Sequence, residues 1–446
     1  MVYLARLTDP AIAAGSFARF DNRMYEVFRT RCLYTARELD NTLERGLAAL
    51  PPLLDSVLQQ IMLPAKHGGG ALRSILFTAS QAFYSSFIAT IKSTQIILSQ
   101  PDSPDLLASN SVDVAQRCHQ QLINEGASHT PNLKWGDVAA PTCHLPTLFN
   151  SASVFYENVL DAKTFKLQKL LTAQVEVCRA SALIDTLVDP RDVARMACLK
   201  KPGASSAQMT LPDPNFPGLV MNNLVYTDFM KLRLGLPPAF GLWKCSCGYD
   251  LSLDYTHCLS CKHMAAEHTR RHDALKHLTT RQCNAFGITA SNEPSSDQIF
   301  AKRLRPDGLQ QFPGGSNLTD NTVISALCDS RIKNRTAGTP KPLDIAADDK
   351  IKKYNKKGNK NSVAARMNAT FYPLAMESHG GMHKTYRKFL QNLALEALDE
   401  GLCEESTYNK LLTNLIGEHA VTLARGNSWA FSKLRRRASR LPRARR

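Results

Sequence analysis

Apolar residues recur at helical spacing through the first half of the chain, separated by polar positions. One such face consists of Leu167, Leu170, Leu171, Val175 and Cys178. Another follows the glycine run at 68–70 and consists of Leu76, Ala79, Phe83 and Phe87. We interpret these faces as core rather than as ligand sites. Residues 100–150 are richer in Pro, Ser and Asn and are typical of a looser connection.

The pattern changes in the second half, where short β-favouring runs stand between helical ones. Residues 320–327 and 371–376 predict strands, whereas residues 351–354, 384–398 and 406 to about 424 predict helices. The expected fold class is α+β, with a helical N-terminal half followed by an α/β domain and C-terminal helices. The expected boundaries are 1–236 (helical), 237–277 (rich in Cys and His), 278–398 (α/β) and 399–446 (a helix and a basic tail).

The chain has 446 residues, enough for two or three domains. Its charge is distributed unevenly between the two halves. The net charge is +16; residues 1–240 carry 22 Lys and Arg against 20 Asp and Glu, and residues 241–446 carry 33 against 19. A basic half-chain favours a polyanionic partner, DNA or RNA, over a merely solvated surface. The candidate nucleic-acid contacts are Arg305, Lys356, Lys357, Arg435, Arg436 and Arg437.

Cysteine usage indicates metal rather than disulfides. Twelve cysteines are too sparse for a disulfide framework, no secretion signal precedes them, and four fall between Cys245 and Cys261. No apolar stretch approaches 18 residues, so we expect no membrane span and an intracellular protein. The basic C-terminal segment is also typical of a nuclear localisation signal, which favours a nuclear location.

Four soft or borderline ligands in one short loop predict a structural zinc site: Cys245, Cys247, His257 and Cys261. Zinc would fold a segment too short to hold a core of its own, with no open position for catalysis. The sequence leaves other ligands open, namely Cys258, His263, His268 and His272. The alternative is a loop of unliganded cysteines.

Two acids suggest a second metal site. Asp307 follows Arg305-Pro306, and Asp320 stands at the start of the first β-favouring run. Converging carboxylates can hold Mg²⁺, which would polarise a phosphodiester and help to activate water. Lys350 or Lys353 would then offset negative charge. Glu377, at the end of the second β-favouring run, is a further candidate member of the site.

More ordinary interpretations accompany these acids. An Arg-Pro-Asp sequence is often only a turn, and pairs of carboxylates are common. Asp348 and Asp349 look like the paired aspartates of a polymerase, but Lys350 and a basic run follow them where an apolar strand is needed. We interpret that pair as a solvated helix start.

The order of these features resembles the region that follows the reverse transcriptase in non-LTR retrotransposons carrying a restriction-like endonuclease. The resembling segments are Leu63-Pro64 with Gly68–Ser74, the Cys245-Cys247-His257-Cys261 knuckle, Arg271–Leu275, Arg305-Pro306-Asp307 with Asp320, and Lys350-x-x-Lys353-Tyr354. The resemblance covers about residues 10–430. It implies a PD-(D/E)XK-like nuclease domain that nicks DNA, and, since the polymerase is missing, a separate reverse transcriptase as a possible partner.

One departure from the family pattern concerns the lysine that usually stands two residues after the second acid. Thr322 occupies that position, so Lys350 or Lys353 must take its role. Three hypotheses follow for the function: an Mg²⁺-dependent DNA endonuclease of a retroelement, a catalytically inactive zinc-knuckle protein that binds nucleic acid, or a scaffold whose helical half binds proteins. The sequence does not predict an oligomeric state.

Overall fold

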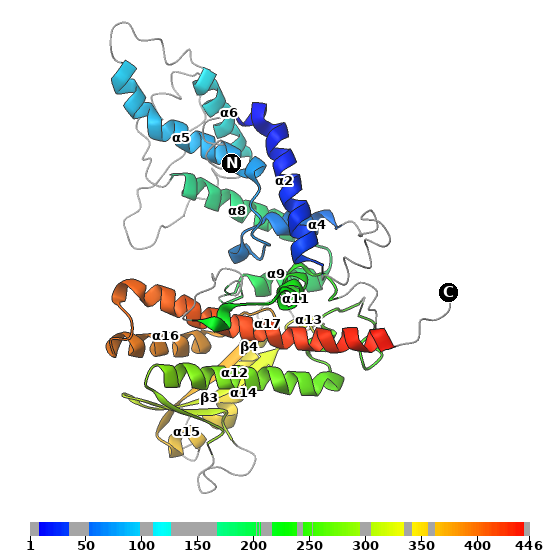
Figure 1. Cartoon of the computed structure of the whole chain (residues 1–446), viewed down its shortest axis with the longest axis vertical. Coiled ribbons are helices and arrows are strands. Elements are labelled where there is room, and N and C mark those ends of the chain that lie inside the picture. Colours follow the sequence, from blue (N-terminus) through cyan, green and yellow to red (C-terminus); the bar gives the residue numbers. More distant parts are fainter. Residues whose placement is uncertain are drawn as a thin grey trace. The chain divides into compact units, whose positions relative to one another are not determined.

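The structure of the protein is a computed structural model with two compact units (Figure 1). It describes residues 9–34, 53–98, 110–125, 167–201, 203–204, 206, 216–238, 244–251, 253–294, 305–333, 341–355 and 362–440. The first unit comprises residues 1–31 and 52–186, and the second comprises residues 32–51 and 187–446. The predicted boundaries at 236, 277 and 398 therefore do not separate compact units.

The first unit is helical, as its apolar periodicity predicts. Its elements are most of α2 (Pro10–Cys32), α4 (Asp55–Met62), the 3₁₀ turn η2 (Ala65–His67), α5 (Ile75–Leu98), α6 (Asn110–Asn124) and α8 (Leu167–Thr186). The two apolar faces named from the sequence lie on α5 and α8, so both helices are confirmed. Leu171 and Val175 are buried, and so are Ala79 and Phe83, which places these faces in core.

A glycine turn joins α4 to α5. Gly68 ends η2 with a φ of 89°, in the left-handed region that favours glycine. A Cβ on Gly69 would lie 1.9 Å from the carbonyl oxygen of Leu63, so no larger residue fits without movement. The chain at Gly69 passes so close to the backbone of Leu63 that only glycine fits there.

Asp21 of α2 holds the start of α5. Its carboxylate accepts hydrogen bonds from the backbone N–H groups of Ile75 (2.9 Å) and Leu76 (3.0 Å) and from the hydroxyl of Ser74 (2.5 Å). These N–H groups have no partner within their own helix, and a negative charge at a helix N-terminus is favourable. Asp21 is thus a capping residue placed by tertiary structure.

The second unit contains a four-stranded sheet between two layers of helices. The strands are β1 (Thr289–Asn292), β2 (Gly308–Phe312), β3 (Gly315–Ile324) and β4 (Ala369–Glu377), in that spatial order. β1 and β2 pair antiparallel, β2 and β3 pair antiparallel, and β3 and β4 pair parallel. The strand predicted at 371–376 lies within β4, whereas the one predicted at 320–327 overlaps β3 only as far as Ile324, and the fold is α+β.

The helices of this unit flank the sheet and lie beside it. They are α9 (Pro190–Leu199), α11 (Asn223–Leu234), α12 (Ala265–Ala285), α13 (Asp329–Lys333), α14 (Pro342–Tyr354), α15 (Val363–Arg366), α16 (Lys384–Asp399) and α17 (Tyr408–Arg440). Short 3₁₀ turns are η4 (Pro217–Leu219), η5 (His257–Leu259), η6 (Lys262–Met264) and η7 (Glu405–Thr407). The predicted helix at 384–398 is confirmed, whereas the one placed at 406–424 begins at Tyr408 and runs to Arg440.

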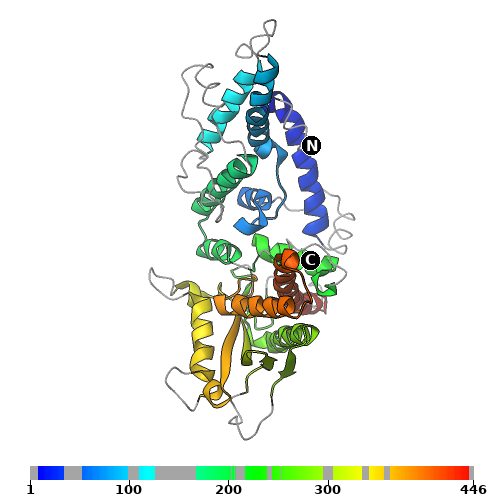
Figure 2. The same cartoon turned by 90° about the vertical axis from the view of Figure 1, so that its left-hand side faces the viewer.

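Alternating side chains of the strands give the sheet two buried faces. Leu318 and Phe371 point toward α14 and α15, where they pack with Tyr354. Leu374 and Met376 point to the other face, where they join a core formed by α12, α16 and α17. Figure 2 shows α14 on one side of the sheet and the α16 layer on the other.

The exposed pair Asp348 and Asp349 lies in the interior of α14. The prediction that these acids are solvated is confirmed. The prediction that they start a helix is wrong, because Pro342 stands at the first position of α14 and the helix begins there.

Candidate functional site

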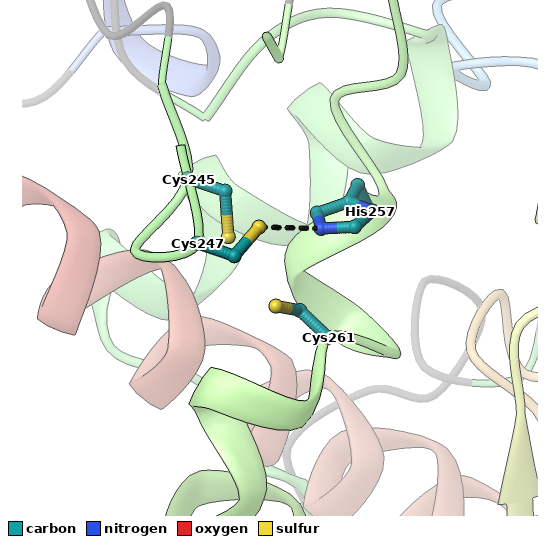
Figure 3. A group of neighbouring side chains, drawn as sticks. All are labelled: Cys245, Cys247, His257 and Cys261. Atoms are coloured by element: carbon teal, nitrogen blue, oxygen red, sulfur yellow. Dashed lines mark hydrogen bonds between the residues drawn. The ribbon is translucent and has the colours of Figure 1, made fainter. Parts of the chain in front are cut away.

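The predicted zinc ligands converge in one space. The sulfur or nitrogen ligand atoms of Cys245, Cys247, His257 and Cys261 all lie within 4.8 Å of one another, and Figure 3 shows the four side chains facing a common centre. Ligands of a tetrahedral zinc ion are separated by roughly 4 Å, given bonds of about 2.3 Å to sulfur. The cluster could therefore hold a metal ion such as zinc. It is the one such group of His, Cys, Asp and Glu ligands in the described part of the chain.

Local backbone structure brings these ligands together. Cys245 and Cys247 lie in a tight turn that closes through a hydrogen bond from the N–H of Cys245 to the carbonyl of Tyr249 (2.8 Å). The ring of Tyr249 stacks on the ring of His257, with centroids 4.1 Å apart. Cys247 Sγ lies 3.2 Å from His257 Nε2. Cys261 follows η5 and comes just before α12, so the last ligand is fixed by the start of a long helix.

The two thiols of the turn differ in acidity. A hydrogen bond from the backbone at Tyr249, supported by His257, lowers the pKa of Cys247 to about 7. Burial raises the pKa of Cys245 to about 12. Because the thiolate is the metal-binding form, a cation in the centre would favour deprotonation of both.

The alternative ligands lie elsewhere. Cys258 is fully buried, and its thiol donates to the carbonyl of Tyr255 (3.7 Å). His268 Nε2 lies 3.0 Å from the carbonyl oxygen of Cys258. His272 is in contact with Asp307, and His263 does not belong to the cluster. The ligand set named from the sequence is therefore the one that the structure brings together.

The knuckle (residues 244–261) is built into the second unit. Its buried residues Leu251 and Leu259 pack in one apolar cluster with Ala430, Phe431 and Leu434 of α17. α17 also packs along α12, which continues toward the sheet. The knuckle is thus connected to the sheet through two helices.

The two predicted acids lie side by side at the start of β2. Gly308 pairs with Thr319 across the β2–β3 ladder, so the next residues, Asp307 and Asp320, face each other. The carboxylate of Asp307 accepts a hydrogen bond from the backbone N–H of Asn321 (2.6 Å), which fixes it against β3. The structure therefore brings together two residues that the sequence separates by twelve others.

His272 of α12 holds Asp307. Its Nε2 lies 2.9 Å from Asp307 Oδ2, the oxygen that also accepts the bond from Asn321. Burial opposes ionisation of Asp307, but the bond from His272 and its charge lower the pKa of this carboxyl below its ordinary value. The same bond raises the pKa of His272. Asp307 Oδ1 has no hydrogen-bond partner among the described residues.

Asp320 is the more buried acid, with 3% of its surface exposed. Burial and the charge of Asp307 raise its pKa, although Lys350 opposes this. Lys350 of α14 forms an ion pair with Asp320. The hydroxyl of Tyr354, one turn further along α14, donates to the carbonyl of Arg305 (2.7 Å). The two crowded carboxylates thus share a single lysine.

Two predicted members of this centre lie away from it. Lys353 is exposed, and its Nζ lies 4.5 Å from the ring centroid of Tyr354. Glu377 pairs with Ile324 in the ladder, four residues beyond Asp320, which is roughly 13 Å along the strand. Its carboxylate instead binds Lys201 (2.5 Å). We correct both assignments: α14 turns only Lys350 toward the acids, and Glu377 belongs to a separate ion pair.

The predicted nucleic-acid residues divide into three groups. Lys356 and Lys357 lie outside the described residues. Arg305 is exposed beside the carboxylates. Arg435 forms two short hydrogen bonds to the buried carboxylate of Asp228 (2.6 and 2.7 Å).

The other basic residues at the end of α17 also have local contacts. Lys433 pairs with Glu267 (2.7 Å), and Arg437 donates to the carbonyl of Ser246 in the knuckle (3.2 Å), while Arg436 is exposed. Up to Arg440 the segment interpreted as a basic tail is helical, and residues 441–446 lie outside the description. Part of the basic charge at this end of α17 therefore stabilises the fold.

Sequence reasoning missed the role of His272. It follows Arg271 four residues after His268, and this spacing suggested metal ligands on one helical face. The structure assigns the two histidines to different neighbours, because His268 lies over the knuckle and His272 reaches the carboxylates. The signal available was that His272 is a member of the resembling segment Arg271–Leu275.

The chain matches no protein-family model and no curated protein. None of the helices within the described ranges is long and apolar enough to cross a membrane.

Proposed function

We propose that the protein is an Mg²⁺-dependent DNA endonuclease whose centre is formed by Asp307, Asp320 and Lys350. The observation that carries the proposal is that Asp307 and Asp320 are neighbours just beyond the last pair of the β2–β3 ladder, beside a lysine from α14. Two neighbouring carboxylates can hold a cation, and a nearby lysine can offset negative charge, during phosphodiester hydrolysis. A PD-(D/E)XK-like arrangement of the sheet would follow from this assignment.

Each residue has a distinct task in this proposal. Asp307 and Asp320 would hold the cation, which when bound polarises the phosphodiester and acidifies water. Lys350 stabilises negative charge on the phosphate. His272 keeps Asp307 ionised and leaves its Oδ1 directed away from the Asn321 bond. Arg305, exposed at the same edge, would contact a neighbouring phosphate.

The knuckle would carry structural zinc and support the nucleic-acid-binding surface. Its four ligands leave no open coordination position, so no chemistry is assigned to it. DNA would be bound mostly through phosphates, and its affinity would fall with salt. By resemblance, the biological setting would be a retroelement, with nicking of the target in the nucleus for a separate reverse transcriptase.

A supercoiled-plasmid nicking assay with Mg²⁺ tests the proposal. We expect the zinc-loaded protein to nick DNA and the double variant Asp307→Ala, Asp320→Ala to lose at least about 100-fold in rate. The matched control is Asp348→Ala, Asp349→Ala, which removes two exposed carboxylates from α14 and should nick as wild type does. Equal nicking by wild type and the Asp307, Asp320 double variant would end the assignment.

A second candidate function is nucleic-acid binding without cleavage. It is favoured by Thr322, which stands where the family has its lysine, and by the Lys350 ion pair, which already offsets the charge of Asp320. This function predicts salt-dependent DNA binding by wild type and by the Asp307, Asp320 double variant alike, with no nicking by either.

A further inference from the structure

A groove of about 500 Å³ lies between α12, the knuckle and the end of β3. His272 and Lys350, the residues that contact the two acids, line one part of it, while Leu259 and Ser260 of the knuckle line another. The strand β3 continues through residues 320–324 after its last pair with β2 at Thr319. The groove therefore follows the part of β3 that β2 no longer covers.

The charges lining this groove are positive. Arg271, Arg331 and Lys350 line it together with His268 and His272, and no carboxylate of the described residues does. Arg331 donates to the carbonyl of Ser325 (2.6 Å) and forms no ion pair within the described part of the chain. Because Lys350 is paired with Asp320 and His272 with Asp307, Arg271 and Arg331 are the lining cations that would attract an anionic ligand.

Arg271 adds a buried positive charge. Its guanidinium donates to Asn427 (2.8 Å) and to the carbonyl of Leu259 (3.3 Å), and no carboxylate among the described residues pairs with it. Burial lowers the pKa of Arg271 to about 10. A buried cation without a counter-charge is costly, and an anion in the groove would reduce that cost.

Two buried side chains of β3 and its end have polar atoms with no partner. Asn321 is 2% exposed, and both its amide oxygen and its amide nitrogen lack a hydrogen bond within the described structure. The hydroxyl of Ser325, 3% exposed, lacks one as well. Both residues line the groove. Unsatisfied polar groups of this kind are rare in folded proteins and point to a missing ligand or water.

The amide of Asn321 narrows the chemistry of that ligand. A phosphate offers only acceptors, whereas a nucleobase edge offers a donor and an acceptor side by side, which a carboxamide can bind at two points. Ser325 lies four residues further on, roughly 13 Å along the chain, and Arg331 contacts its carbonyl. Near the acids the groove thus offers Asn321, whose amide suits a nucleobase. Further away it offers Ser325 and Arg331, which suit a phosphate.

We infer that this groove is a nucleotide subsite, in which Asn321 contacts the base next to the cleaved bond and Arg331 with Ser325 binds a phosphate further along the same strand. The inference rests on the proposed function for the position of the cleaved bond. Binding of the strand does not require cleavage. The cut strand would run from the carboxylates toward the knuckle, along residues 320–324 of β3, which do not pair with β2.

Binding and cleavage are measured separately on the full-length, zinc-loaded protein. Binding of a fluorescent DNA duplex is followed in Ca²⁺ over a range of salt concentrations, and cleavage products are mapped in Mg²⁺ on a library with random bases around the cut. The variants are Arg331→Ala, Ser325→Ala and Asn321→Leu, with Lys388→Ala as the matched control, since Lys388 is an exposed cation of α16 outside the groove. Circular dichroism and zinc content verify folding of each variant.

We expect Arg331→Ala to raise the Kd about tenfold and to lower the slope of log Kd against log salt by about one, as loss of one phosphate contact requires. Asn321→Leu should relax the base preference at the position beside the cut. Lys388→Ala should match wild type. Unchanged Kd, salt slope and base preference in the groove variants would overturn the subsite while nicking by wild type persists. Binding that depends on Arg331 in a protein that never nicks would overturn the proposed nuclease instead, and the phosphate-binding part of the subsite would stand.

Discussion

The knuckle and the carboxylate pair are two candidate metal sites in one unit, built in opposite ways. The knuckle draws all four ligands from 17 consecutive residues, and a tight turn with a 3₁₀ turn is enough to assemble them. The carboxylate pair needs β2, β3, α12 and α14 to be in place, because Asp307 comes just before β2 and its neighbours come from three other elements. These neighbours are Asp320, His272 and Lys350. A local site can be found by spacing alone, whereas a distributed site depends on the whole sheet.

The two sites also differ in what surrounds them. The knuckle packs into an apolar cluster against α17, so its metal would hold the fold together. The carboxylates border a positively lined groove and have a free oxygen at Asp307. This difference is why we assign stability to one site and chemistry to the other.

The largest effect should come from removing a knuckle ligand. Cys261→Ser should lose zinc and destabilise the second unit by on the order of 5 kcal/mol or more, because the metal contributes folding free energy directly. Metal analysis and thermal unfolding measure both. Cys258→Ser is the matched control: its thiol faces the carbonyl of Tyr255, so zinc should stay bound. Zinc lost from the Cys258 variant and retained by the Cys261 variant would reverse the ligand assignment.

A smaller loss of stability is expected where α17 is joined to α11. Arg435→Ala leaves the buried carboxylate of Asp228 without its cation, which should cost about 3 kcal/mol in free energy of unfolding. Lys388→Ala, which removes an exposed cation of α16, should change it by less than about 0.5 kcal/mol. Urea denaturation compares the two. Equal free energies of unfolding in the two variants would show that the Arg435–Asp228 contact does not stabilise the fold.

The nicking rate should depend on one lysine of α14 and not on the other. Lys350→Ala removes the cation beside Asp320 and should lower the nicking rate about 100-fold, while zinc content stays unchanged. Lys353→Ala should keep the rate within about threefold, since this lysine is exposed beside Tyr354. Single-turnover nicking of plasmid measures both. A larger loss from Lys353 than from Lys350 would contradict the geometry of the centre.

The smallest effect concerns the core that positions both sites. His419 of α17 contacts the hydroxyl of Tyr386 (2.7 Å) and the amide of Gln282 (2.9 Å), which joins α17 to α16 and α12. Burial lowers the pKa of His419 to about 3. Between the unfolded pKa of about 6.5 and this value, the unfolded chain binds a proton that the folded chain does not. Stability should therefore fall as pH falls through this window.

Replacing His419 by Gln isolates that contribution. The free energy of unfolding of wild type should drop more steeply between pH 6 and 4 than that of His419→Gln, by up to about 1.4 kcal/mol per pH unit. Contributions shared by both proteins, including zinc release, cancel in the difference. Parallel curves would mean that His419 binds its proton as readily in the folded state as in the unfolded one.

The sequence by itself determined the features that depend on neighbours along the chain. Helical periodicity identified α5 and α8, β-favouring runs identified β3 and β4, and ligand spacing identified Cys245, Cys247, His257 and Cys261 as a cluster that could bind metal. These predictions succeeded because a turn or a helix of a few residues fixes which side chains share a face.

Only the tertiary structure decided which distant residues meet. It placed Lys350 rather than Lys353 on Asp320, gave Glu377 to Lys201 and Arg435 to Asp228, and brought His272 to Asp307. These outcomes depend on sheet register and helix rotation, and a shift of one residue in either would turn a different side chain toward the acids. Composition and spacing do not determine that choice, because it follows from how α12, α14 and α17 pack on the sheet.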